Sequence, residues 1–241
     1  MARITVLELP ATWGDPRGAL KEVDRLVAQD PATHLVVCPE ASFTGYVSPE
    51  GDWDLKPFAE PISGPTAVAV RELAKRHRIH LVAPLVLEEG GAIFNTMVVA
   101  SPSGAIDTIY RKRHPWIPER QWGTRGTAQH PIFTIGDLSV SIAICYDLHF
   151  LAHEEETRDT LSRIDLLLFP SAWVDEEETR IPMLRSLATT FGCAVAAANW
   201  GEGVVLVPGQ GESCILDAKG RPLALADAGV RRIDAVVGPR T

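Results

Sequence analysis

Short apolar runs rich in β-branched residues alternate along the chain with stretches whose apolar residues recur at helical spacing. Runs of the first kind predict buried strands, and stretches of the second kind predict amphipathic helices. Strands are expected over residues 4–9, 34–38, 80–87, 93–100, 105–110, 132–144 with a break at Gly136-Asp137, 165–169, 193–198 and 233–237. Helices are expected to begin at Pro16, behind an Asp15 cap, and at Pro65, and to lie between Leu151 and Ser162 and over residues 181–191.

The turns between these runs distinguish hairpins from crossover connections. Ser101-Pro102-Ser103-Gly104 predicts one hairpin, and Lys219-Gly220 predicts another near the end of the chain. Some strands, such as 34–38 and 166–169, are apolar on both faces, as expected of strands that lie between other layers. The order of elements therefore predicts an α/β fold of mixed sheets with helices on their outer faces.

Size and composition fit a single globular domain over residues 1–241. With 46% hydrophobic and 22% charged residues, a chain of this length can bury a substantial core. No run approaches the roughly 20 apolar residues that span a bilayer, and no signal-peptide pattern opens the chain, so we expect a cytoplasmic protein without a membrane partner. The formal net charge of −8, without a long basic stretch, argues against a nucleic-acid partner and favours a small-molecule substrate.

Three residues at expected strand ends could carry chemistry. Cys145 follows the apolar run 139–144, and Glu40 and Lys112 also come just after expected strands. Catalytic groups of α/β enzymes gather at such ends. Taken singly, each residue also has an ordinary interpretation, as a buried thiol, a surface carboxylate or part of a solvated basic run. The four cysteines form no C-x-x-C pair and have no zinc-like spacing, so we expect free thiols and no structural metal.

Five short motifs in order give these residues a common interpretation. They are Cys38-Pro39-Glu40-Ala41-Ser42-Phe43-Thr44-Gly45-Tyr46, Tyr110-Arg111-Lys112-Arg113-His114 with Pro118-Glu119 after it, Ile144-Cys145-Tyr146-Asp147, Pro170-Ser171-Ala172-Trp173, and Gly211-Glu212-Ser213-Cys214-Ile215-Leu216-Asp217. In this order they resemble the nitrilase or carbon–nitrogen hydrolase superfamily, in its amidase-like branch, which has a Glu-Lys-Cys triad. The resemblance covers nearly the whole chain and implies a four-layer α-β-β-α sandwich with two mixed sheets.

The resemblance also implies a role for each matching residue. Cys145 would be the nucleophile that forms a thioester with the acyl group of an amide, and Glu40 would be the general base and acid. Lys112 and the backbone N–H of Tyr146 would stabilise the oxyanion. Glu119 resembles an extra carboxylate that some members place beside the triad to orient the amide nitrogen. No metal or organic cofactor is needed for this chemistry.

Four further residues are expected to bind substrate: Tyr46, Trp116, His149 and Trp173. Many family members carry Arg at the position of His149. A mostly neutral histidine there weakens the case for N-carbamoyl amino acids and other acidic substrates, because a carboxylate prefers an arginine fork. The substrate is therefore expected to be a small, linear, neutral or modestly polar amide, hydrolysed to the carboxylic acid and ammonia.

Other functions remain open at this point. A true nitrilase resembles this chain but usually has Trp-Glu after the catalytic cysteine, whereas Tyr146-Asp147 is typical of amidases and carbamoylases. An N-carbamoyl hydrolase is a second alternative, and a catalytically silent ligand-binding homologue is a third. Retention of Glu40, Lys112, Glu119 and Cys145 together speaks against the silent homologue. Family members often dimerise, so we expect a homodimer.

Overall fold

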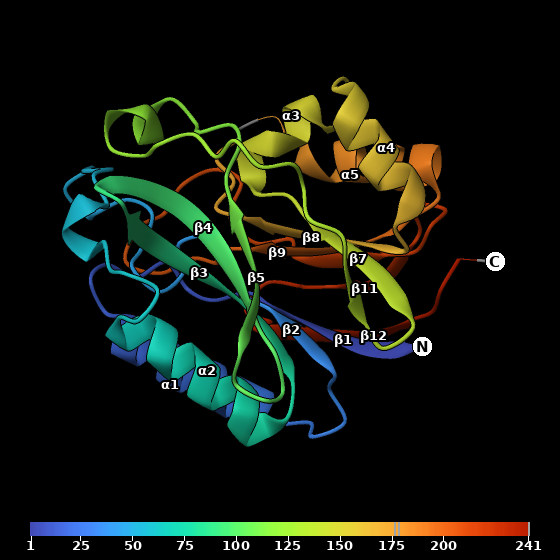
Figure 1. Ribbon diagram of the computed structural model, residues 1–241, viewed down its shortest axis with the longest axis horizontal. Coiled ribbons are helices and arrows are strands. Elements are labelled where there is room, and N and C mark those ends of the chain that lie inside the picture. The colour runs from blue at the N-terminus through green and yellow to red at the C-terminus, as the bar shows by residue number, and fades with distance from the viewer. Residues whose placement is uncertain (176, 178, 241) are drawn as a thin grey trace.

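Two six-stranded mixed sheets form the centre of the structure (Figure 1). The computed structural model describes residues 1–175, 177 and 179–240. The strands, in sheet order, are β12 (Arg232–Val237), β1 (Ala2–Leu7), β2 (Leu35–Val37), β3 (His80–Glu89), β4 (Ala92–Ala100) and β5 (Ile106–Arg111) in the first sheet, and β11 (Pro222–Leu225), β10 (Cys214–Leu216), β9 (Ala194–Asn199), β8 (Leu166–Ser171), β7 (Leu138–Ile142) and β6 (Phe133–Ile135) in the second.

Helices cover the outer face of each sheet (Figure 1). The first sheet carries α1 (Pro16–Val27) and α2 (Pro65–His77), and the second carries α3 (Leu148–Leu151), α4 (Glu155–Arg163) and α5 (Arg180–Phe191). Successive side chains of β2 alternate between layers, because Leu35 and Val37 pack in the core between the sheets whereas Val36 packs against α1 and α2. The four-layer α-β-β-α sandwich with two mixed sheets is confirmed.

Most element boundaries differ from the expected ones by only a few residues, and one short helix was not expected. The helix expected between Leu151 and Ser162 is α4, whereas α3, which precedes it across a turn, had no counterpart among the expected elements. Glu154 has an extended backbone just before α4, and its carboxylate lies 3.0 Å from His114 Nε2 and 3.1 Å from Arg113 Nη2. The helical pattern is interrupted where this residue reaches across to the segment after β5.

The directions of the strands bring Glu40, Lys112 and Cys145 to the same end of the two sheets. β1, β2 and β3 run parallel, as do β7, β8 and β9, so their carboxyl ends gather on the same side of each sheet. Glu40 lies just beyond β2, Cys145 just beyond β7 and Lys112 directly after β5. None of the helices within the described ranges is long and apolar enough to cross a membrane.

Candidate active site

A buried lysine lies between two buried carboxylates. Lys112 Nζ donates a hydrogen bond of 2.7 Å to Glu40 Oε1 and another of 2.7 Å to Glu119 Oε2. The side chain of Lys112 is 1% exposed, and those of Glu40 and Glu119 are 0% and 2% exposed. Buried charges are costly unless they are paired and hydrogen-bonded, so this cluster is a strongly specified feature of the fold.

Cys145 lies on a tight turn at the end of β7. It opens a short 3-10 helix, η3 (Cys145–Asp147), and its backbone has the left-handed φ of 46° that non-glycine residues seldom adopt. The N–H of Tyr146 is one of the first in this helix and therefore has no partner within it. The turn thus presents a thiol and a backbone donor on the same short segment.

Asp147 anchors this turn to the segment that carries Lys112. Its buried carboxylate accepts hydrogen bonds from Ile144 N at 2.9 Å, from Tyr110 Oη at 2.7 Å and from His114 N at 2.9 Å. Burial alone would raise the pKa of Asp147, but the hydrogen bonds from His114, Ile144 and Tyr110 outweigh it and the pKa falls below its usual value. The carboxylate is therefore ionised at neutral pH and holds the end of β5 against the Cys145 turn.

Asn95 and two backbone N–H groups complete the hydrogen bonding of the carboxylates. The side-chain amide of Asn95, in β4, donates to Glu40 Oε1 at 2.7 Å and also to Glu119 Oε1. Ala172 N donates to Glu40 Oε2 at 2.9 Å, and Trp116 N donates to Glu119 Oε2 at 2.6 Å. With the bond from Lys112, each glutamate accepts three hydrogen bonds. An ionised carboxylate has about four acceptor positions, so each keeps one position for another donor.

Burial keeps the Cys145 thiol protonated. Burial raises the pKa of Cys145 well above its usual value and the Glu40 carboxylate adds to the rise, whereas the Lys112 cation opposes it. Burial would by itself lower the pKa of the Lys112 ammonium, but the carboxylates of Glu119 and Glu40 outweigh this effect and raise it. At neutral pH the site therefore holds a fixed cation and a thiol that needs a base to become a nucleophile.

The Glu119 carboxylate lies close to Tyr46. Burial raises the pKa of the Glu119 carboxyl, and although the Lys112 cation opposes this rise, the Glu40 carboxylate adds to it. Burial, together with the charges of Glu119 and Glu40, also raises the pKa of the Tyr46 hydroxyl, which therefore stays protonated. This hydroxyl is buried without a hydrogen-bond partner in the part of the chain that the structure describes.

A small cavity of about 60 Å³ opens beside the thiol. Its lining residues are Trp116, Cys145, Tyr146, His149, Ala172, Trp173 and Val174. His149 stacks on Trp173 with ring centroids 5.6 Å apart and an interplanar angle of 21°. Burial lowers the pKa of His149, and Asp175 opposes this only in part, so the imidazole wall of the cavity is neutral at pH 7.

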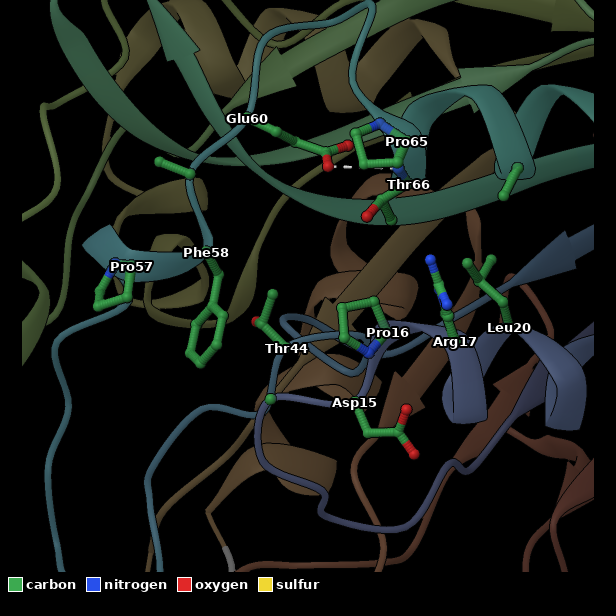
Figure 2. Close-up of a pocket in the computed structure, with 13 residues that line it drawn as sticks. Asp15, Pro16, Arg17, Leu20, Thr44, Pro57, Phe58, Glu60, Pro65 and Thr66 are labelled. Carbon is green, nitrogen blue, oxygen red and sulfur yellow. Dashed lines mark hydrogen bonds between the residues drawn. The ribbon is translucent and has the colours of Figure 1, made fainter.

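A much larger cavity, of about 650 Å³, lies elsewhere, between the N-termini of α1 and α2 (Figure 2). None of its described lining residues belongs to the cluster around Cys145. Carboxylates already occupy both helix ends, because Asp15 accepts from Gly18 N at 2.9 Å and Glu60 accepts from Thr66 N at 3.2 Å. The smaller cavity is therefore the candidate active site, since it is the one that reaches the thiol.

The structure brings together nearly all the residues expected from the sequence. Trp116, His149 and Trp173 line the cavity with Cys145, and Tyr46 lies behind them, stacked on Trp116 at 6.2 Å between ring centroids. Asn95 was not expected in the site, although a polar amide inside the apolar strand β4 is a signal of a buried hydrogen-bonding role. The role of Ala172 was not expected either, because only its backbone N–H takes part and any residue type supplies one.

The chain matches known proteins over nearly its full length. A family model described as carbon-nitrogen hydrolase matches residues 3–233. A protein named nitrilase, from Pyrococcus abyssi, is 27% identical over 95% of this chain and 86% of its own length. A formamidase from Bacillus cereus strain Q1 is 26% identical, but that match covers 53% of this chain and only 39% of the formamidase.

Solved structures have the same fold. XC1258 from Xanthomonas campestris, a CN-hydrolase superfamily protein, has a TM-score of 0.83 and 22% identity, covering 98% of this chain and 90% of its own. A mutant of the amidase from Nesterenkonia sp. AN1, with acrylamide added at its active-site cysteine, has a TM-score of 0.83 and 23% identity, covering 99% of this chain and 94% of its own.

Proposed function

Because this chain belongs to the carbon-nitrogen hydrolase family, within the nitrilase superfamily, we propose that it hydrolyses a short, neutral amide through a thioester at Cys145. Members of the superfamily are hydrolases of C–N bonds, and the relatives of this chain include proteins named nitrilase, formamidase and amidase. The arrangement that supports the reaction most directly is the buried pair of carboxylates joined by Lys112 beside a protonated thiol.

In the first half of the reaction, Glu40 takes the thiol proton as Cys145 Sγ attacks the amide carbonyl carbon. The remaining acceptor position of Glu40 suits it to this step, since Lys112, Asn95 and Ala172 already hold the carboxylate in place. The carbonyl oxygen becomes an oxyanion, which the Lys112 cation and the N–H of Tyr146 stabilise. The C–N bond then breaks, and Glu40 passes its proton to the nitrogen, which leaves as ammonia.

In the second half, water takes the place of the amine. Glu40, ionised again, removes a proton from a water molecule that attacks the thioester carbonyl. Collapse of the second oxyanion breaks the C–S bond, and the proton returns to the sulfur of Cys145, so the enzyme is regenerated and the acid is released. Glu119 and the hydroxyl of Tyr46, which has no hydrogen-bond partner among the described residues, would orient the substrate's amide nitrogen and hold it against the base.

The cavity supports a short acyl group. Its volume of about 60 Å³ is far below the roughly 300–1,000 Å³ of pockets that hold drug-sized ligands, so a small acyl group fits it best. The described residues of its lining are mostly aromatic and apolar, His149 among them is neutral, and none of them is a cation that could bind a substrate carboxylate. Formamide, acetamide and propionamide fit this description better than N-carbamoyl amino acids do.

A panel of paired substrates tests the proposal. Ammonia release and acid formation are measured with formamide, acetamide, propionamide and hexanamide, with acetonitrile and propionitrile, and with an N-carbamoyl amino acid. We expect the short amides to be hydrolysed with the highest kcat/KM and an acyl adduct to appear on Cys145 in intact-mass spectra. Acid formed from the nitriles alone would identify a nitrilase, and binding without turnover would identify a silent homologue.

His149 and Trp173 are proposed to limit the length of the acyl chain. His149→Ala removes one wall of the cavity, so we expect the kcat/KM ratio of hexanamide to acetamide to rise about tenfold, because each accommodated methylene contributes a factor of this order. His153→Ala, which changes an exposed histidine nearby, is the matched control and should leave the ratio unchanged. An unchanged ratio in both variants would remove His149 from the binding site.

We also propose that residues 1–241 form one catalytic domain, and that the protein is a cytoplasmic homodimer. The match of the family model to residues 3–233 supports the first proposal. The dimer and the location remain predictions from the family resemblance and from the composition of the chain.

A further inference from the structure

Asn95 is buried inside β4, where its neighbours in the strand are mostly apolar. Its side-chain nitrogen donates one hydrogen to Glu40 and the other to Glu119. An asparagine amide has two donors, so this residue uses both of them on the carboxylate pair. Asn95 is thus a second bridge between the glutamates. It differs from Lys112 in that it has no charge.

The carboxylate pair needs such a bridge because one cation faces two anions. Lys112 supplies a single positive charge to Glu40 and Glu119, and two carboxylates in one dry site repel each other unless donors stabilise them. The other titratable groups that face the pair are Cys145 in η3 and Tyr46 in the loop after β2. Both are uncharged when protonated, so neither offsets the excess negative charge.

We propose that Asn95 is a positioning residue that keeps Glu40 and Glu119 ionised together, so that Glu40 can accept the thiol proton at neutral pH. This inference rests on the proposed function, because it takes Glu40 as the base. Without Asn95, each carboxylate loses one of its three donors and the pair holds a proton more readily. A free base in the pair is then available to the thiol only at higher pH.

The pH dependence of two reactions tests this role. Asn95→Ala is compared with the unchanged protein in kcat/KM for acetamide and in the rate of alkylation of Cys145 by iodoacetamide, mapped by peptide mass. We expect the acid limb of both profiles to move up by about one pH unit. At pH values below the limb, kcat/KM and the alkylation rate should each fall about tenfold, and at pH values above it both should recover. Asn95→Ser, which retains one donor, should give a smaller shift.

Thr96→Val is the matched control, because Thr96 is the next residue of β4, is equally buried, and directs its hydroxyl to the backbone oxygen of Phe94. It should leave both acid limbs in place. A uniform loss of activity in Asn95→Ala, with unshifted limbs in both reactions, would show a merely structural role and overturn the inference. If Asn95→Ala does not fold, as judged by thermal unfolding, the same comparison is made with Asn95→Ser.

The two reactions separate this inference from the proposed function. Alkylation of Cys145 needs the base but no amide substrate. If the unchanged protein hydrolyses no amide, yet the alkylation limb still moves in Asn95→Ala, the proposed reaction fails and the role of Asn95 stands. If amides are hydrolysed and neither limb moves, the proposed reaction stands and the role of Asn95 fails.

Discussion

The Cys145→Ala variant is expected to lose at least about 10⁴-fold in kcat/KM for short amides, the scale on which removal of a nucleophile acts in other hydrolases. Lys112, Glu40 and the N–H of Tyr146 would still be present in this variant, but no thioester could form. The measurement is ammonia release together with intact mass after rapid quenching. The acyl adduct seen with the unchanged protein should be absent.

Cys193→Ala is a suitable control for this experiment. Cys193 is also buried, but it precedes β9 at the end opposite the one that reaches the site, so its removal should leave turnover and the adduct nearly unchanged. An adduct that persists in Cys145→Ala would identify a different nucleophile. Retained turnover without any adduct would instead point to direct attack by water.

The Lys112→Met variant is expected to lose both activity and stability. Methionine preserves the length of the side chain but leaves Glu40 and Glu119 buried without a cation, and an unpaired buried charge costs about 3–5 kcal/mol of the free energy of unfolding. Loss of the oxyanion's cation should reduce kcat about 10²–10³-fold. Both effects can be measured, by denaturant titration and by ammonia release.

The loss of stability should depend on pH in a defined direction. Without the cation, the buried carboxyls have a higher pKa in the folded chain than in the unfolded chain, so the unfolded state loses its protons first as pH rises. The deficit is therefore largest at neutral and higher pH, and it shrinks as pH falls through about 4.3, below which both states increasingly hold the protons. A deficit that grows on acidification would contradict this account.

Two further variants test whether the buried carboxylates cause the stability loss in Lys112→Met. Lys112→Met combined with Glu119→Gln removes one of the unpaired charges, so it should regain part of the stability but none of the turnover. Lys56→Met changes a largely exposed lysine that lies 3.9 Å from Asp54, and an exposed pair of this kind contributes at most about 1 kcal/mol. Equal losses in Lys56→Met and Lys112→Met would rule out the buried cluster as the origin.

The sequence by itself determined the layers of the fold and the main chemical groups. Apolar runs and helical spacing are local properties of the chain. The runs predicted β2, β7 and β8, of which β2 and β8 are apolar on both faces because they lie between layers, and an apolar residue at every third or fourth position predicted α1 and α2. The motifs around Glu40, Lys112 and Cys145 were recognisable for a related reason. A strand end, a turn and a reactive side chain lie within a few residues of each other.

The tertiary structure alone decided how these groups interact. Asn95 bridges Glu40 and Glu119 from a different strand, and Ala172 contributes a backbone N–H from the other sheet. The sequence indicates at most that Asn95 is a polar residue in an apolar strand, and it does not identify the partners of either residue. Likewise, the ion pairs of Glu154 with Arg113 and His114 join segments about 40 residues apart, and no local pattern predicts them. Hydrogen bonds and pKa values depend on distance and burial in space, which hydrophobic periodicity does not record.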